Sequence, residues 1–280
     1  MNNQKNLHGL NHREYEHPFD KAALQTLEKT PALPLILKAF NKNTLDKLFK
    51  LQHAGSKVEI SESHFPKLYR IFLKACEILN VQNIPKFYLF EDYNVNAYAT
   101  GFTYPIVSIS SGVLERFNEK ELMFIIGHEL GHIKSEHLLY HQLATWLPTI
   151  GRFLGYLTLG IGDLVATGLQ YSLLYWYRMS EYTCDRAGLL TVQDKQAAIS
   201  ALSKLGGYTT STTYGSFSTE AYLEQVERFE DLDFDQLDKL VKNIAIMDSS
   251  HPWTTLRVKY IKKWYEQGDY EKVLNRNTAR

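Results

Sequence analysis

The chain has 280 residues, which is enough for one large or two small domains with a buried core. Its 31 basic and 31 acidic residues cancel and form no block of like charge, so nucleic acid is not expected as a partner. The two cysteines, Cys76 and Cys184, cannot form a disulfide framework and suit a reducing compartment.

Residues 1–60 are predicted to be an N-terminal arm followed by accessory helices. The first 20 residues are polar and lack the apolar core of a signal peptide, so we predict a cytoplasmic protein. We also predict that these residues form a poorly ordered arm whose histidines are solvated. Helices are predicted over residues 21–29 and 35–55, the second ending at Gly55, and a short strand over residues 58–60.

A helix and three short strands are predicted next. Residues 65–80 carry apolar side chains at helical spacing, with Cys76 as a small core residue. The inward positions are Leu68, Ile71, Phe72, Ala75, Ile78 and Leu79. Residues 86–90, 96–100 and 106–110 are rich in aromatic and β-branched residues and are separated by turn formers, which predicts a small sheet.

Residues 119–137, EKELMFIIGHELGHIKSEH, predict a buried helix. Asn118, with Glu121 three residues later, resembles a capping box and marks the helix start. The apolar residues that recur at helical spacing are Leu122, Ile125, Ile126, Leu130 and Ile133. This pattern is typical of a helix packed in the protein interior.

The same helix carries a candidate metal site. His128 and His132 are four residues apart, so both imidazoles project from one face and can bind one metal ion. Glu129 lies about 100° around the helix from His128, where it can take a proton from metal-bound water. Because buried polar groups need partners, a metal site explains these side chains better than a plain helix does. Gly127 and Gly131 leave room for another backbone close to the site.

Residues 138–177 are nearly free of charge. Only Arg152 and Asp163 interrupt them, yet these two leave no uncharged run as long as the ~18 residues that a spanning helix needs. We predict a helical hairpin packed in the protein, with peripheral contact to a bilayer and true spanning as the less favoured alternatives. Helices follow over residues 179–191, 220–247 and 252–267, with a loop over 206–219.

Two histidines do not complete a catalytic zinc site, which usually takes three protein ligands and a water. A metzincin would need glycine at position 135 and histidine at 138, where this chain has Ser135 and Leu138. A ligand from a later helix is the remaining choice, and SEYTCD offers Glu181 and Asp185 one turn apart. We predict that Glu181 binds the metal and that Asp185 accepts the free N–H of a ligating imidazole.

A second pair, His137 and His141, repeats the four-residue spacing without an interposed glutamate. We predict a polar helix edge there rather than a second metal site.

HELGH followed by SEYTCD resembles the HtpX-like and CAAX prenyl protease family of zinc metallopeptidases, of the gluzincin type. YEHPFD and LQHAG near the N-terminus resemble its soluble bacterial-type branch. The resemblance implies an α+β, predominantly α-helical, zincin-like fold with a small sheet before the HExxH helix. Residues 61–280 are then the metallopeptidase domain, in one compact unit with residues 1–60.

The resemblance also implies roles for four further residues. NAYATG resembles the family's edge strand, in which Asn96 and Ala97 bind the substrate backbone. His251, in the dipeptide His-Pro, resembles the histidine that stabilises the transition state, with Arg257 supporting it. Cys184 stands where the family usually has alanine.

The predicted function is zinc-dependent hydrolysis of peptide bonds in a peptide or an unfolded protein. One Zn²⁺ per chain is held by His128, His132 and Glu181, and Glu129 is the general base. Two alternatives stay open: a membrane-surface adaptor with a structural zinc site, and a zinc hydrolase acting on non-peptide amides.

Overall fold

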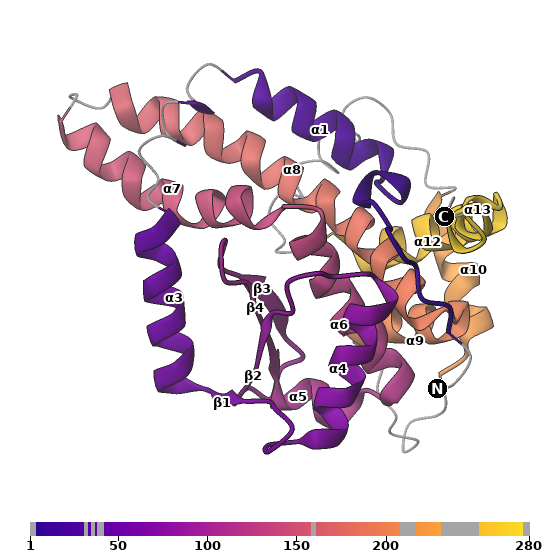
Figure 1. The fold of residues 1–280 in the computed structure, drawn as a ribbon. Coiled ribbons are helices and arrows are strands. Elements are labelled where there is room, and N and C mark those ends of the chain that lie inside the picture. The colour runs from indigo at the N-terminus through magenta and orange to yellow at the C-terminus, as the bar shows by residue number, and fades with distance from the viewer. Residues whose placement is uncertain are drawn as a thin grey trace.

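The computed structural model describes residues 4–30, 33–34, 37, 42–157, 161–207, 217–230 and 252–276. Its elements are, in chain order, η1 His12–Glu14, α1 Pro18–Glu28, α3 Lys42–Ser56, β1 Val58–Glu59, α4 Pro66–Ile78, β2 Lys86–Phe90, β3 Ala97–Thr100, β4 Ile106–Ser110, α5 Ser111–Arg116, α6 Glu119–Lys134, α7 Leu138–Leu157, α8 Ile161–Val192, α9 Lys195–Leu205, α10 Thr219–Glu230, α12 Thr254–Glu266 and α13 Asp269–Leu274. Helices predominate around one small sheet, which confirms the predicted α+β class (Figure 1).

The sheet has the strand order β1-β2-β4-β3. β2 and β4 are parallel, while β1 and β3 pair antiparallel with them. Successive residues of β2 point to opposite faces, so Phe87 stacks on Phe72 of α4 while Tyr88 packs against Phe49 of α3. Helices therefore cover both faces, and β3, the last strand in the order, presents an edge. The three predicted strands are confirmed, with the middle one beginning at Ala97.

α6 is the central helix, and its start has the predicted cap. Asn118 Oδ1 accepts from the backbone N–H of Lys120 and of Glu121, and Glu121 Oε2 accepts from the N–H of Asn118 at 2.8 Å. The same carboxylate pairs with Lys204 of α9 at 2.7 Å in the interior. The capping box thus also ties α6 to α9, so the start of the helix is fixed by both local and tertiary contacts.

α7 and α8 form the predicted hairpin, which extends away from the sheet with α1 lying along it (Figure 1). Buried residues of all three helices, among them Leu147, Leu173 and Leu27, build a second core. These residues show one face of the hairpin packed in the protein; the side chains of residues 149–166 are outside the described set. α8 runs unbroken through residue 178, so the helix predicted from residue 179 is its second half.

The predicted disordered arm is wrong for residues 4–20. Leu7, Leu10 and Tyr15 lie in the main core, and the backbone N–H of Leu7 donates to Ile78 O at 2.9 Å. His17 is also buried rather than solvated. These side chains are widely spaced along a polar segment, so no periodicity reveals their burial. The predicted domain division at residue 60 stays a prediction, and core residues come from both sides of it.

Three further differences separate prediction and structure. His137, just before α7, and His141, in its first turn, are buried instead of forming a polar edge, because the start of α7 lies against α8. α5, α9 and α13 were not predicted, and α12 begins at Thr254, with Pro252 before the cap. Of the predicted helix over residues 220–247, the part within the described residues is α10.

Candidate active site

α6 and α8 approach closely because two glycines face α8. A Cβ at Gly127 would lie 2.3 Å from Thr191 Oγ1, and one at Gly131 would lie 2.8 Å from the Ala187 Cβ. Both distances are far shorter than van der Waals contact allows, so larger residues would push the helices apart. The predicted room for a second backbone is therefore filled by α8.

This approach brings the three predicted metal ligands together. His128 Nε2 lies 3.3 Å from Glu181 Oε2, and His132 Nε2 lies 3.2 Å from Glu181 Oε1. One donor atom from each of the three residues lies within 4.8 Å of the other two, and all three side chains are buried. Donor atoms at 2.0–2.2 Å from a tetrahedral zinc ion are about 3.4 Å apart, so the geometry and the donor types fit zinc.

Asp185 lies behind His128, as predicted from its position one turn after Glu181. Its Oδ1 is 3.0 Å from His128 Nδ1. Arg257 binds both oxygens of this carboxylate, through Nε at 2.9 Å and Nη2 at 2.6 Å. Burial alone would raise the pKa of Asp185, but Arg257 and His128 hold it below its usual value. The buried carboxylate is therefore ionised and can accept a hydrogen bond from the Nδ1–H of His128.

The two histidines differ in their electrostatic surroundings. Burial disfavours the charged form of His128, but the carboxylates of Glu181 and Asp185 outweigh it and raise its pKa to about 10. Burial dominates at His132 and lowers its pKa to about 4 in spite of Glu181. The negative charge of Glu181 thus favours a cation on the Nε2 side of His128, where the three metal donors meet.

A cavity of about 420 Å³ opens beside these residues. His128 and Glu129 line it from α6, and Asn96 and Ala97 line it just before and at the start of β3. The remaining lining residues are Val95, Ile125, Leu205, Pro252, Trp253, Thr254 and Arg257. The structure thus brings the general-base candidate, the edge strand and His128, one of the three metal donors, to one cleft of a size that suits a ligand site.

Arg257, predicted from the resemblance, binds Asp185 and lines the cleft. Cys184 is buried with Gly131 against its backbone, and the three donor atoms come from other residues. His251 lies outside the described residues, while its neighbour Pro252 lines the cleft.

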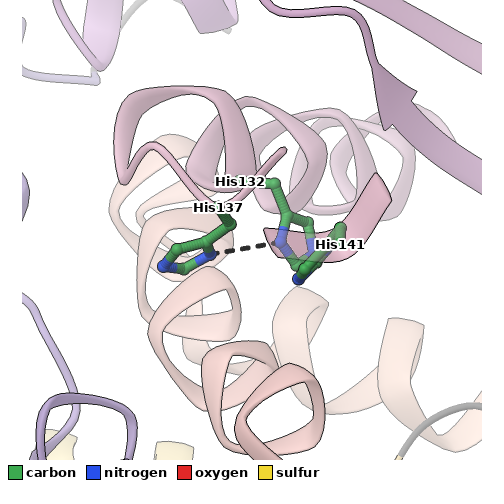
Figure 2. Close-up of side chains that lie close together, drawn as sticks. All are labelled: His132, His137 and His141. Carbon is green, nitrogen blue, oxygen red and sulfur yellow. Dashed lines mark hydrogen bonds between the residues drawn. The ribbon is translucent and has the colours of Figure 1, made fainter. Parts of the chain in front are cut away.

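The sequence did not reveal all of the polar residues around the site. His137 Nδ1 lies 3.2 Å from His132 Nδ1, and the centroid of the His141 ring lies 4.6 Å from that of the His132 ring (Figure 2). Asp20 of α1 lies 3.3 Å from His137 Nε2. Asp20 belongs to the stretch YEHPFD, and that local motif was the only available signal.

A His-Glu-x-x-His pair on one helix, a glutamate from a second helix, and a cleft beside an edge strand together define a zincin-like metallopeptidase. The chain belongs to peptidase family M48, whose model matches residues 62–265. It is therefore a metalloprotease, and the predicted family is confirmed.

Several curated proteins are similar to this chain. The plastoglobule-localized metallopeptidase 48, chloroplastic, of Arabidopsis thaliana is 30% identical over 265 residues, which cover 94% of this chain and 75% of that protein. Protease HtpX of Acinetobacter baumannii strain AYE is 30% identical over 153 residues, or 44% of this chain and half of that protease. The HtpX homolog of Ralstonia nicotianae is 25% identical over 232 residues, covering 76% of this chain and 78% of that protein.

Proposed function

We propose that this metalloprotease is a zinc endopeptidase with one Zn²⁺ per chain, held by His128, His132 and Glu181. One observation carries the proposal: these donors meet at zinc-like spacing beside a cleft that Glu129 also lines. A zinc ion in this place supplies a Lewis acid and lowers the pKa of water to about 7.

The side chains of this chain then have distinct tasks. Glu129 accepts a proton from the attacking water and delivers it to the leaving nitrogen. Asp185, held by Arg257, keeps the proton of His128 on Nδ1, so that Nε2 is free to bind the metal. His251 is proposed to donate a hydrogen bond to the oxyanion, which the position of Pro252 in the cleft wall supports.

The proposed substrate is a peptide or an unfolded protein. β3 presents the edge of the sheet beside the cleft, with Asn96 just before it and Ala97 at its start. A substrate added as a further strand is bound through its main chain, which tolerates many side-chain sequences. This observation favours peptides over the alternative of small non-peptide amides.

Metal removal and a substrate panel test this function. Purified protein is expected to contain one zinc per chain and to cleave an unfolded protein. Cleavage should be lost after dialysis against a chelator and should return when one equivalent of zinc is added. Hydrolysis of small amides with no cleavage of peptides would support the non-peptide alternative. Zinc content without any hydrolysis would support the adaptor.

We also propose peripheral membrane contact through residues 138–177. Of the described helices, none is both long and apolar enough to cross a bilayer. Tyr171 and Tyr175 of α8 are 58% and 44% exposed, and they line a shallow groove with Phe19 of α1, which is 45% exposed. Exposed aromatic side chains are typical of membrane-interface contacts.

High salt or carbonate is expected to release the protein from membranes, because peripheral contact buries little apolar surface. In flotation with anionic liposomes, Tyr171→Ser/Tyr175→Ser should float less than the wild type. Tyr104→Ser is the matched control, since Tyr104 is 70% exposed on a different part of the chain. Extraction by detergent alone would contradict the proposal.

A further inference from the structure

The two candidate histidine ligands have different groups behind them. His128 Nδ1 contacts a carboxylate, Asp185, at 3.0 Å. His132 Nδ1 instead lies 3.2 Å from Nδ1 of His137, a histidine just before α7, and the two rings lie edge to face (Figure 2). His137 is buried, and its other ring nitrogen points to Asp20 of α1.

The proton positions follow from the chemistry of the rings. Neutral imidazole has one N–H, so a metal ion on His132 Nε2 leaves the proton of that ring on Nδ1. His132 then donates to His137 Nδ1, which can accept only if the proton of His137 is on Nε2. That nitrogen lies 3.3 Å from Asp20 Oδ2, which accepts it. All the donors and acceptors match in one arrangement.

Asp20 is built to remain an anion in the interior. It is 1% exposed and lies in the first turn of α1, where the helix dipole favours negative charge. Trp176 Nε1 donates to Oδ1 at 2.9 Å, and the Thr183 hydroxyl donates to Oδ2 at 2.6 Å. Burial alone would raise the pKa of Asp20, but the hydrogen bonds and His137 hold it below its usual value.

We propose that Asp20 and His137 form a relay that fixes the tautomer and ring orientation of His132. This inference rests on the proposed function, because metal on Nε2 makes Nδ1 of His132 a donor. Both are positioning residues, since they act through His132 and stand outside the described cleft lining. Groups of this kind typically change metal affinity or activity by about 10–100-fold. The N-terminal segment thereby supports the active site.

A second metal ion bound by His132, His137 and His141 is the competing use of these residues. His132 would have to bind ions through both of its nitrogens and lose its remaining proton. The relay keeps that ring neutral and satisfies His137 on both sides. His141 Nε2 has a protein partner as well, the Ser180 hydroxyl at 3.1 Å. One ion and a hydrogen-bonded relay therefore explain the cluster with fewer charges in the interior.

Asp20→Asn tests the relay with little change in shape. The NH2 group of the new Asn must face either Trp176, which is itself a donor, or Thr183, whose hydroxyl can accept. The Thr183 side is therefore favoured, and there the NH2 group also points at His137 Nε2. His137 would then carry its proton on Nδ1, opposite the N–H of His132. The apparent zinc Kd, from competition with a chromophoric chelator, is expected to rise by about 10–100-fold. kcat should fall with KM little changed.

Two further comparisons separate the relay from simple packing. His137→Asn keeps a hydrogen-bond acceptor near His132 Nδ1. His137→Leu has a side chain similar in size to Asn but no acceptor, so it should bind zinc more weakly than His137→Asn. Asp46→Asn is the matched control. Asp46 is also buried, but its carboxylate accepts from the backbone N–H groups of Phe102 and Thr103, so the zinc Kd of this variant should equal that of the wild type. Melting temperatures report folding for every variant.

The outcomes divide clearly. Unchanged zinc affinity in folded Asp20→Asn, or equal losses in Asp20→Asn and Asp46→Asn, would overturn the relay. Two zinc ions in the wild type, falling to one in His137→Leu, would identify a second metal site instead. If Asp20→Asn does not fold, equal zinc affinity of the two His137 variants still refutes the relay. His132→Ala tests the proposed metal site independently of the relay. Wild-type zinc binding in this variant would refute the metal site itself.

Discussion

Glu129→Gln is expected to keep one zinc per chain while losing at least ~10²–10⁴-fold in kcat, the contribution of a positioned general base. Glu129 lines the cleft next to His128, but the three metal donors come from other residues. Gln has the same shape and cannot accept the proton of the attacking water. The measurement is kcat on an unfolded-protein substrate, together with zinc content and melting temperature.

The matched control is Glu136→Gln. Glu136 is exposed and follows α6, so its loss of charge should leave kcat and zinc content unchanged. Near-wild-type turnover by the zinc-loaded Glu129→Gln protein would show that another group takes the proton. Loss of zinc would instead place Glu129 among the ligands.

Glu181→Ala is expected to cause the largest loss of zinc. Its two carboxylate oxygens lie 3.3 Å and 3.2 Å from the facing nitrogens of His128 and His132, so its removal deletes one of three donors. It also removes the buried negative charge that favours a cation at His128. We expect zinc to be lost on gel filtration and activity to be lost with it. Zinc quantification before and after the column is the measurement.

Asp185→Asn is the comparison for that variant. It alters the group behind His128 without removing a donor, so zinc affinity or activity should fall by only about 10–100-fold. Wild-type zinc affinity in Glu181→Ala would place the third ligand elsewhere, and Asp185 would then be the next residue to test.

Local patterns were sufficient to predict several features of this protein. The capping box at Asn118, the apolar repeat of α6 and the four-residue spacing of His128 and His132 all act within one or two helical turns. Such short-range signals survive without tertiary context. The strands of the sheet were predicted for the same reason, since alternation and turn formers are local. Glu181 needed chemical reasoning as well, because nothing local joins it to α6.

The sequence by itself determined the helix with its histidines, the small sheet and the class of reaction. Only the tertiary structure decided which polar residues stand behind the ligands. Asp20 is 163 residues from Thr183 and 117 from His137, yet it contacts both. Arg257 likewise reaches Asp185 from α12. Such contacts depend on how α1, α6, α8 and α12 pack, and helical periodicity indicates which face of a helix is apolar without indicating its neighbour. The burial of His137 and of the N-terminal arm follows from packing alone, so it became apparent only in the folded chain.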